Sequence, residues 1–235
     1  MAKRVRLLVA IDGPAGAGKS TVARRVAERL GYVLVDTGAL YRCVALAASR
    51  AGFTPHGELS EDDELAIGDL AKELAAGRQI QLEPSGRVVL DGEDVSRAIR
   101  SPEMSLGASR VSAIPRVREA LLSMQRQAGE HGGAVMEGRD IGTVVFPDAE
   151  AKFFLTASAE QRAGRRHAEL LEKGSAVTFD ETLADVRRRD TADTDRPVAP
   201  LRQADDAVLV DSSTMAIDDV VDVIVREVRA REAQS

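Results

Sequence analysis

A glycine-rich segment near the start of the chain has the residue types and spacing of a polyphosphate-binding loop. Residues 13–20 satisfy the pattern G-x-x-x-x-G-K-[ST]. In such a loop the backbone N–H groups and the following helix N-terminus point at the phosphates, the lysine reaches the β- and γ-phosphates, and the hydroxyl ligates Mg²⁺. The alternative is a glycine-rich turn that binds nothing. The residues expected to bind ATP are Gly13, Pro14, Ala15, Gly16, Ala17, Gly18, Lys19, Ser20 and Thr21, with Lys19 catalytic and Ser20 the metal ligand.

The elements on either side of this loop are those that a phosphate site requires. Residues 5–11 form an apolar run typical of a strand buried in a parallel sheet. Between Ser20 and Leu30 apolar residues recur at helical spacing, and Gly31 follows as a C-cap. A strand over 32–35 and a helix over 39–50 come next. This order predicts right-handed β-α-β crossovers.

After the helix over 39–50 the pattern predicts an inserted segment and then further strands and helices of the main sheet. Residues 52–101 change texture, with a short helix over 64–75 and a hairpin of 79–82 and 87–90. Further helices are expected at 102–113, 115–129, 158–173, 180–190 and 217–228, and further strands at 134–136, 151–155 and 207–210. The fold class expected is α/β, a P-loop NTPase-type parallel sheet flanked by helices. We expect a single domain over 1–235, with a small inserted acceptor-binding subdomain at about 52–101 and a helical lid at about 158–200.

Polar side chains follow the second and third core strands, at the sheet edge where ligands of open α/β folds bind. After the second strand, Thr37 can donate a hydrogen bond and Arg42 can hold an acceptor phosphate. The alternative is that Asp36 and Thr37 cap the next helix and Arg42 is a solvated charge. After the third strand, residues 137–140 read Glu-Gly-Arg-Asp and can orient an acceptor hydroxyl or a water on Mg²⁺. The alternative there is a surface ion pair in a turn.

A charged run, Arg-Arg-Arg-Asp-Thr-Ala-Asp-Thr-Asp-Arg-Pro over 187–197, ends one of the predicted helices. One interpretation is a solvated helix face. The other is a mobile lid whose arginines close over the phosphates and exclude water. Arg162, Arg165 and Arg166 on the preceding helix can serve the same purpose.

Composition restricts the class of protein. The chain has 235 residues, of which 44% are hydrophobic and 30% charged, as in an ordinary globular protein. A net charge of −6 argues against a broad surface for a nucleic acid polymer. One cysteine excludes an internal disulfide and, with three histidines, a structural zinc cluster. The first apolar run is too short for a signal peptide or a membrane span, so we expect a cytoplasmic protein without a membrane partner.

Two further features of the sequence restrict the type of reaction. The chain contains no asparagine, so it lacks the N-K-x-D motif that reads guanine in GTPases. A phosphotransferase or a motor-type ATPase remains. Because the chain has one P-loop and no partner domain, a kinase that acts on a small molecule is favoured.

Several strings, taken together, resemble bacterial cytidylate kinases over essentially the whole length. They are IDGPAGAGKST, VDTGALYR, DGEDVS at 91–96, PRVREALL at 115–122, EGRDIGTVVFPDA at 137–149 and RRRDTADTDRPVAPL. The resemblance implies transfer of the γ-phosphoryl group of ATP to CMP or dCMP, in pyrimidine metabolism, with Mg²⁺. The partners expected are these nucleotides, and we expect a monomer.

The resemblance also assigns roles to matching positions. The catalytic residues it and the motifs imply are Lys19, Arg139, Asp140, Arg166 and Arg189. The acceptor-binding residues are Thr37, Arg42, Ser109, Arg118, Arg139, Asp140, Arg189, Asp193 and Arg196. The family often has Ser where Thr37 stands and Asp where Glu137 stands, and residues 56–87 match it least.

Two other functions remain open. One is a kinase for a different monophosphate such as UMP, which a panel of acceptors would reveal. The other is a P-loop module that uses ATP only as a conformational switch. That module would hydrolyse ATP slowly, at a rate that no acceptor changes.

Overall fold

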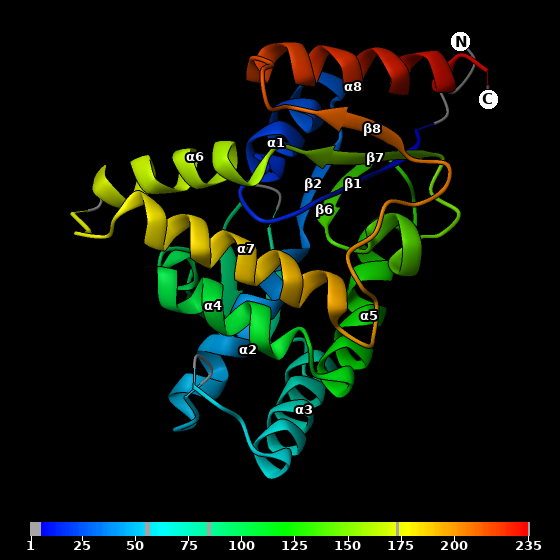
Figure 1. Ribbon diagram of the computed structural model, residues 1–235. Coiled ribbons are helices and arrows are strands. Elements are labelled where there is room, and N and C mark those ends of the chain that lie inside the picture. Colours follow the sequence, from blue (N-terminus) through cyan, green and yellow to red (C-terminus); the bar gives the residue numbers. More distant parts are fainter. Residues whose placement is uncertain (1–5, 55–56, 84–85, 173, 235) are drawn as a thin grey trace. The chain divides into compact units, whose positions relative to one another are not determined.

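The computed structural model describes residues 6–54, 57–83, 86–172 and 174–234, and the chain divides into two compact units (Figure 1). The first, called the sheet unit, comprises Met1–Val33 and Gly132–Ser235. The second, called the helical unit, comprises Leu34–His131. The helical unit is thus longer at both ends than the insert expected at 52–101.

The main sheet has the order β2-β6-β1-β7-β8, and the pairings of β1 with β6 and β7, and of β7 with β8, are parallel. Every residue of β1 is buried, which explains why this strand is a continuous apolar run. The expected parallel sheet of an α/β fold is confirmed. The strands are β1 (Leu8–Asp12), β2 (Val33–Asp36), β6 (Ala134–Gly138), β7 (Ala151–Thr156) and β8 (Val208–Asp211).

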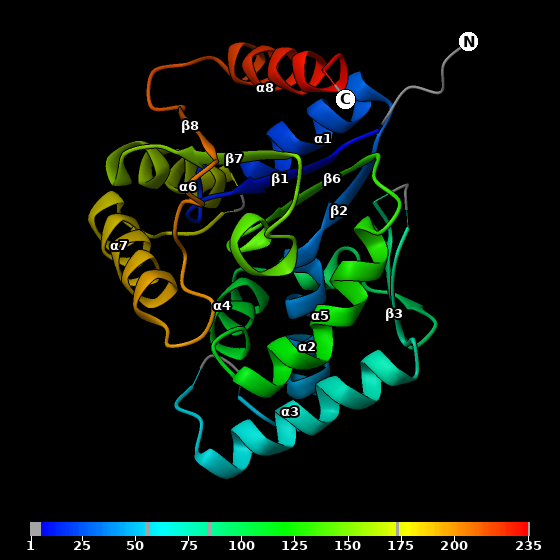
Figure 2. The ribbon, with the colours of Figure 1, turned by 90° about the vertical axis from the view of Figure 1, so that its right-hand side faces the viewer.

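Among the described residues, four α-helices belong to the sheet unit, and two of them, α1 and α8, lie along one face of the sheet (Figures 1 and 2). The C-terminal α8 is tied back to the start of the sheet, because the Tyr32 hydroxyl donates to Glu232 at 2.5 Å and accepts from the Leu7 N–H at 2.9 Å. Helices α6 and α7 pack against each other. The bounds are α1 (Lys19–Leu30), α6 (Ala159–Glu172), α7 (Phe179–Asp195) and α8 (Ile217–Glu232).

Helix α7 is longer than the sequence pattern predicted. The helix expected over 180–190 begins at Phe179 and continues to Asp195, so most of the charged run is helical. Neither Gly nor Pro interrupts α7 before Pro197. The helical conformation is disfavoured for a residue that precedes proline, so Arg196 is extended and α7 ends at Asp195.

In the part of the helical unit that the structure describes, four α-helices pack around an apolar core. Residues such as Val44, Ile67, Ile99 and Leu121 are fully buried there. The predicted hairpin is present as β3 and β4, which pair antiparallel; turn residues 84–85 lie outside the described residues. A further short strand, β5, was not predicted. The bounds are α2 (Thr37–Arg50), α3 (Glu61–Ala76), α4 (Pro102–Val111), α5 (Pro115–Gly129), β3 (Ile80–Leu82), β4 (Val88–Leu90), β5 (Glu93–Asp94) and a 3₁₀ turn η1 (Ala98–Arg100).

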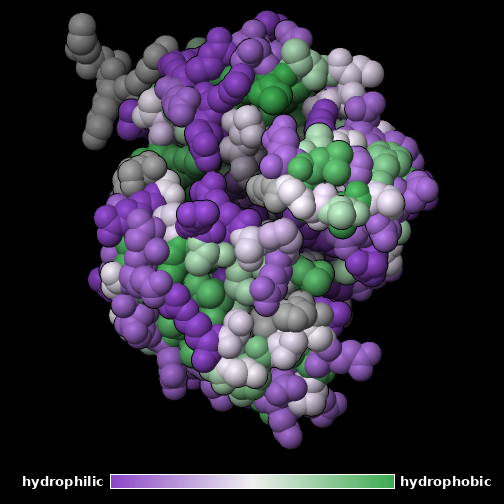
Figure 3. All heavy atoms as spheres, turned by 90° about the vertical axis from the view of Figure 1, so that its left-hand side faces the viewer, coloured by the Kyte–Doolittle hydropathy of each residue, from purple (hydrophilic) through white to green (hydrophobic). Residues whose placement is uncertain are grey.

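The surface is mainly polar on the face that Figure 3 shows, where hydrophobic residues form small groups separated by hydrophilic ones. Within the described ranges, every helix is too short or too polar to cross a membrane.

Candidate active site

The phosphate loop lies between β1 and α1, and its glycines are sterically required. Gly13 has φ +151°, and a Cβ at this position would lie 1.9 Å from the Leu155 carbonyl oxygen of the neighbouring strand. Gly16 has φ +77°, and its Cβ would lie 3.2 Å from Cβ of Arg162. Helix α1 follows directly, without an acidic residue in its first turn. Its N-terminal N–H groups therefore favour an anion.

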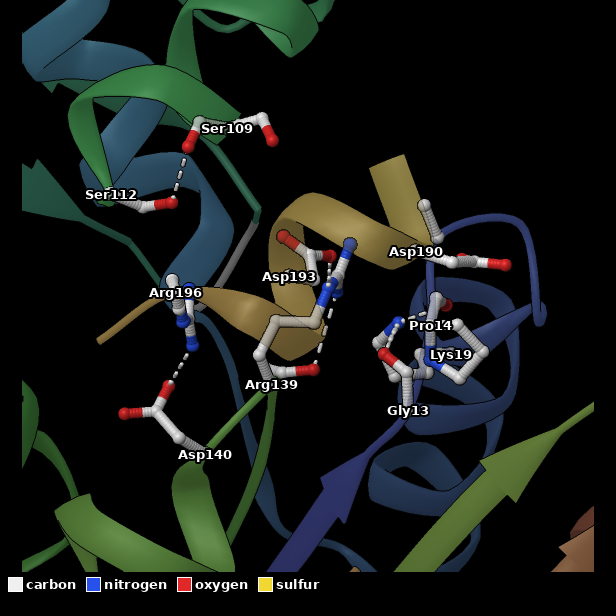
Figure 4. Close-up of polar contacts among 12 residues, drawn as sticks. Gly13, Pro14, Lys19, Ser109, Ser112, Arg139, Asp140, Asp190, Asp193 and Arg196 are labelled. Atoms are coloured by element: carbon white, nitrogen blue, oxygen red, sulfur yellow. Dashed lines mark hydrogen bonds and ion pairs between the residues drawn. The ribbon is translucent and has the colours of Figure 1, made fainter. Parts of the chain in front are cut away.

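Lys19 is buried beneath this loop, with 6% of its surface exposed. Its Nζ donates to the carbonyl oxygens of Gly13 at 2.7 Å and Pro14 at 2.8 Å (Figure 4). Burial, together with the positive charge of Arg139, lowers the pKa of Lys19 to about 7. Lys19 and the partly exposed Arg139 repel each other, and two neighbouring cations of this kind form a site in which an anion is stabilised.

Asp12, the last residue of β1, links the phosphate loop to the segment after β6. Its Oδ1 accepts from the Ile141 N–H at 2.8 Å, and its Oδ2 accepts from the Gly142 N–H at 2.7 Å. Burial raises the pKa of Asp12 to about 6 although both N–H groups oppose that change. These N–H groups belong to η2 (Ile141–Val145), one turn of π-helix that sequence patterns did not predict. Asp12 was also missed as a site residue, because an apolar run closed by Asp-Gly-Pro reads simply as a strand end.

Arg139 and Asp140, directly after β6, each contact the segment at the end of α7. The Arg139 Nε donates to Asp193 Oδ2 at 2.7 Å (Figure 4). Asp140 Oδ1 lies 3.5 Å from Nη2 of Arg196, whose Nε donates to the Ala199 carbonyl at 2.6 Å. Four predicted site residues are therefore brought together as two ion pairs, and the alternative of a surface pair within one turn does not describe them.

Arg139, Arg196 and Arg189 form a charged cluster around Asp193. Burial would raise the pKa of Asp193, but Arg139, Arg196 and Arg189 together lower it. Burial also lowers the pKa of Arg189, and the charge of Arg139 adds to that effect. The arginines thus favour the ionised form of the Asp193 carboxylate.

The solvated-face interpretation of the charged run on α7 holds for only part of the run. Arg187 and Arg188 are solvated, with side chains 62% and 69% exposed, and they pair with Glu160 and Asp185. Arg189 belongs to the buried cluster instead. Helical spacing separates these neighbours, because successive side chains are turned by about 100°.

The arginines of α6 differ in their contacts. Arg165 donates from Nη2 to the Ser212 carbonyl at 2.7 Å, beside the phosphate loop residue Ala17. Arg166 pairs with Glu169 on its own helix at 2.9 Å, with 26% of its side chain exposed. Arg162 is buried and is paired with Asp190 at 2.5 Å.

In the helical unit, the N-terminus of α2 carries two of the predicted acceptor residues. Asp36 is the N-cap and accepts from the Ala39 N–H at 3.1 Å, so the capping alternative is confirmed for this residue. Thr37 is 2% exposed. The Nη1 atom of Arg42 lies 3.6 Å from Oδ2 of Asp36, and 28% of the Arg42 side chain is exposed. Arg42 is therefore only partly solvated.

Arg118 on α5 is the most enclosed of the acceptor arginines expected in this unit, at 8% exposed. Its guanidinium lies 5.5 Å from the ring centroid of Tyr41 and donates to the Ser112 carbonyl at 3.3 Å. The Tyr41 hydroxyl accepts from Gln125 Nε2 at 3.4 Å. Ser109 lies on α4, where its carbonyl accepts from the Ser112 hydroxyl at 2.9 Å (Figure 4). Gln125, a buried polar residue on an apolar helix face, was missed because glutamine carries no motif signal.

A parallel sheet with a phosphate loop after its first strand, a buried loop lysine and arginines near the strand ends defines a P-loop kinase. Comparison with known proteins agrees, since the family model described as cytidylate kinase matches residues 9–230. The chain belongs to the cytidylate kinase family, as its sequence motifs indicated.

Curated relatives match almost the whole chain. A cytidylate kinase of Syntrophotalea carbinolica is 54% identical, covering 97% of this chain and 94% of the relative. One of Geobacter sulfurreducens is 50% identical, covering 98% and 96%. Among solved structures, an uncharacterized protein from Eubacterium ventriosum aligns with a TM-score of 0.53 at 12% identity, covering 96% of this chain and 99% of that one, a likeness of fold alone.

Proposed function

We propose that this protein transfers the γ-phosphoryl group of ATP to CMP or dCMP, giving CDP or dCDP. The observation that carries the proposal is the burial of Lys19 at the phosphate loop, where burial and then the charge of the nearby Arg139 lower the pKa of Lys19. The repulsion between these two cations is offset when an anionic polyphosphate binds between them. Family membership supplies the acceptor.

Catalysis then requires positioning and charge neutralisation more than proton transfer. The attacking oxygen of a nucleoside monophosphate is already an anion, so no general base is needed. Lys19 moves its hydrogen bonds from the Gly13 and Pro14 carbonyls to the donor phosphates. Arg139, Arg189 and Arg166 stabilise the charge on the transferring group, and exclusion of water prevents hydrolysis.

Each unit carries residues that we propose contact the acceptor. In the helical unit they are Thr37, Arg42, Ser109 and Arg118. In the sheet unit the carboxylate of Asp193 holds the pentose, while Arg196 and Asp140 support it as an ion pair.

Magnesium fits this chain as an ion held mostly by the nucleotide. Among the described residues no three His, Cys, Asp or Glu side chains gather as a metal site. Ser20 is exposed at the start of α1, where its hydroxyl is one oxygen ligand of the kind that Mg²⁺ uses beside phosphates and waters. Bound there, Mg²⁺ neutralises phosphate charge. We further propose a monomer in the cytoplasm that acts on small nucleotides only.

A coupled assay of ADP release tests the proposal. With ATP and Mg²⁺, CMP and dCMP should stimulate turnover far above the rate without acceptor. Lys19→Ala should lose most turnover, on the order of 10²- to 10³-fold, while the fold survives. Slow hydrolysis that no acceptor changes would support the conformational-switch alternative, and preference for UMP would overturn the base assignment.

A further inference from the structure

Arg162 on α6 makes contacts that differ from those of a phosphate ligand. Its side chain is 5% exposed. Nε donates to the Ala157 carbonyl at 2.9 Å, and Nη1 donates to the Ala15 carbonyl at 3.0 Å. Nη1 and Nη2 also donate to the two oxygens of Asp190, at 2.8 Å and 2.5 Å.

These contacts already use the bidentate face of the guanidinium. The fork of two parallel N–H donors is the geometry with which arginine recognises carboxylate or phosphate, and here it is filled by Asp190. To hold a phosphate in the same way, Arg162 would have to release that carboxylate. Its role therefore lies in the contacts it makes within the protein.

The acceptors of Arg162 connect two functional segments. Ala15 belongs to the phosphate loop, and Asp190 belongs to α7. The loop lies directly on Arg162, since a Cβ on Gly16 would come within 3.2 Å of the Arg162 Cβ. One guanidinium thus joins the phosphate loop to α7.

Asp190 is placed on α7 where it can set the orientation of the catalytic cluster. Around the helix axis, Asp193 lies between Arg189 and Asp190, at about 40° from the first and about 60° from the second by the 100° turn per residue. A tether at Asp190 therefore limits rotation of α7. Such a rotation would displace both Arg189 and Asp193.

We propose that Arg162 and Asp190 are positioning residues that hold the phosphate loop and α7 in the geometry required for phosphoryl transfer. This inference rests on the proposed function, because it assumes that Arg189 and Asp193 contact nucleotides. It assigns Arg162 a role different from Arg166.

The α6–α7 pair also provides a matched control. Glu160 on α6 and Arg187 on α7 form a second ion pair between the same helices, at 2.9 Å, but their side chains are 57% and 62% exposed. An exposed pair contributes little stability. Glu160→Gln should therefore leave kcat unchanged.

The experiment measures kcat and both KM values for the full-length protein carrying Asp190→Asn, Arg162→Lys or both. Misplaced catalytic groups reduce the rate of transfer more than binding, so each single variant should lose about 10- to 100-fold in kcat while both KM values stay within about threefold. The double variant should lose little more than the worse single variant, because the two residues act as one unit. Asp190→Glu, which keeps the carboxylate, should recover part of kcat.

Three results would overturn the inference. A rise in the KM for ATP in Arg162→Lys, with normal kcat in Asp190→Asn, would make Arg162 a phosphate ligand. Lower melting temperatures with unchanged kcat in the Arg162 and Asp190 variants would show that the pair only stabilises the fold. A decrease in kcat for Glu160→Gln as large as that for Asp190→Asn would show that the effect is not specific to the Arg162–Asp190 pair. Failure of the wild-type protein to phosphorylate any nucleoside monophosphate would instead overturn the proposed function, and the positioning role with it.

Discussion

Arg139 and Asp193, 54 residues apart in the chain, form an ion pair of 2.7 Å between Nε and Oδ2. Arg139 directly follows β6, and Asp193 lies in the last turn of α7. The pair therefore fixes the end of α7 to the carboxyl edge of the sheet. In the proposed reaction both residues also face the acceptor nucleotide.

Asp193→Ala should weaken the use of CMP and dCMP more than the use of ATP. A hydrogen bond to a charged group contributes about 1.5–3 kcal/mol, so we expect the acceptor KM to rise roughly 10- to 150-fold and the ATP KM to change little. Steady-state kinetics with each substrate varied will measure both. Asp195→Ala, at an exposed position of the same helix, is the control. Equal losses for donor and acceptor would show that Asp193 is misplaced.

Arg118→Met should raise the KM for CMP at least tenfold and leave the KM for ATP unchanged. The reason is that, in the proposed function, the buried guanidinium over Tyr41 supplies charge-assisted hydrogen bonds to the acceptor phosphate. Arg116→Met is the matched control on α5, because Arg116 is 55% exposed and pairs with Asp69 at the surface. Similar kinetics for the two variants would argue against an acceptor role for Arg118.

Asp12 should make the stability of the nucleotide-free protein depend on pH. Its pKa is about 6 in the folded protein against 3.8 in the unfolded chain, so the folded state binds the proton more tightly. The contribution of Asp12 to the free energy of unfolding is therefore fully present below pH 3.8 and is lost as the pH rises through about 6. At about 1.4 kcal/mol per pH unit, the loss is on the order of 3 kcal/mol.

Asp12→Asn provides the comparison, because asparagine does not titrate. Denaturant unfolding at several pH values should show the wild-type protein losing stability relative to Asp12→Asn between pH 4 and pH 7. A difference that is constant, or that changes in the opposite direction, would contradict the environment described for this carboxylate.

Gly13→Ala should destabilise the protein by on the order of 3 kcal/mol. Alanine combines a strained backbone at φ +151° with a Cβ that meets the Leu155 carbonyl oxygen at 1.9 Å. Gly164→Ala is the control, since nothing lies within 4 Å of a Cβ there and α6 should gain up to about 1 kcal/mol. Thermal unfolding of both variants measures the contrast, and a Gly13→Ala protein of normal stability would exclude the close approach.

Periodicity predicted most elements of the fold because burial governs them. The helix over 115–129 agrees with α5 at both ends, since Pro115 starts it and Ile114 precedes it in extended conformation. The π-helical turn after β6 was not predictable, because its cause is a tertiary contact: Asp12, 129 residues away from Ile141, binds its N–H groups. The third strand of the small sheet has only two residues, too few for alternation to show.

The site was predictable only in part for the same reason. Lys19 carries a local motif, whereas Ser109 and Arg118 resemble ordinary helix residues and were identified only through family resemblance. Arg162 was grouped with Arg165 and Arg166 because the three share one helix. Their contacts differ because each guanidinium meets different partners, and the partner of Arg162, Asp190, lies 28 residues away in sequence.

The most direct test of the central claim is a competition among acceptors with the products identified. The protein is given limiting ATP with Mg²⁺ and an equimolar mixture of CMP, dCMP, UMP, AMP and GMP, and the diphosphates formed are quantified by mass spectrometry. The account predicts CDP and dCDP as the main products, formed by Lys19→Ala at a rate on the order of 10²- to 10³-fold lower. Predominant UDP, or ADP released without any new nucleoside diphosphate from the acceptors, would contradict it.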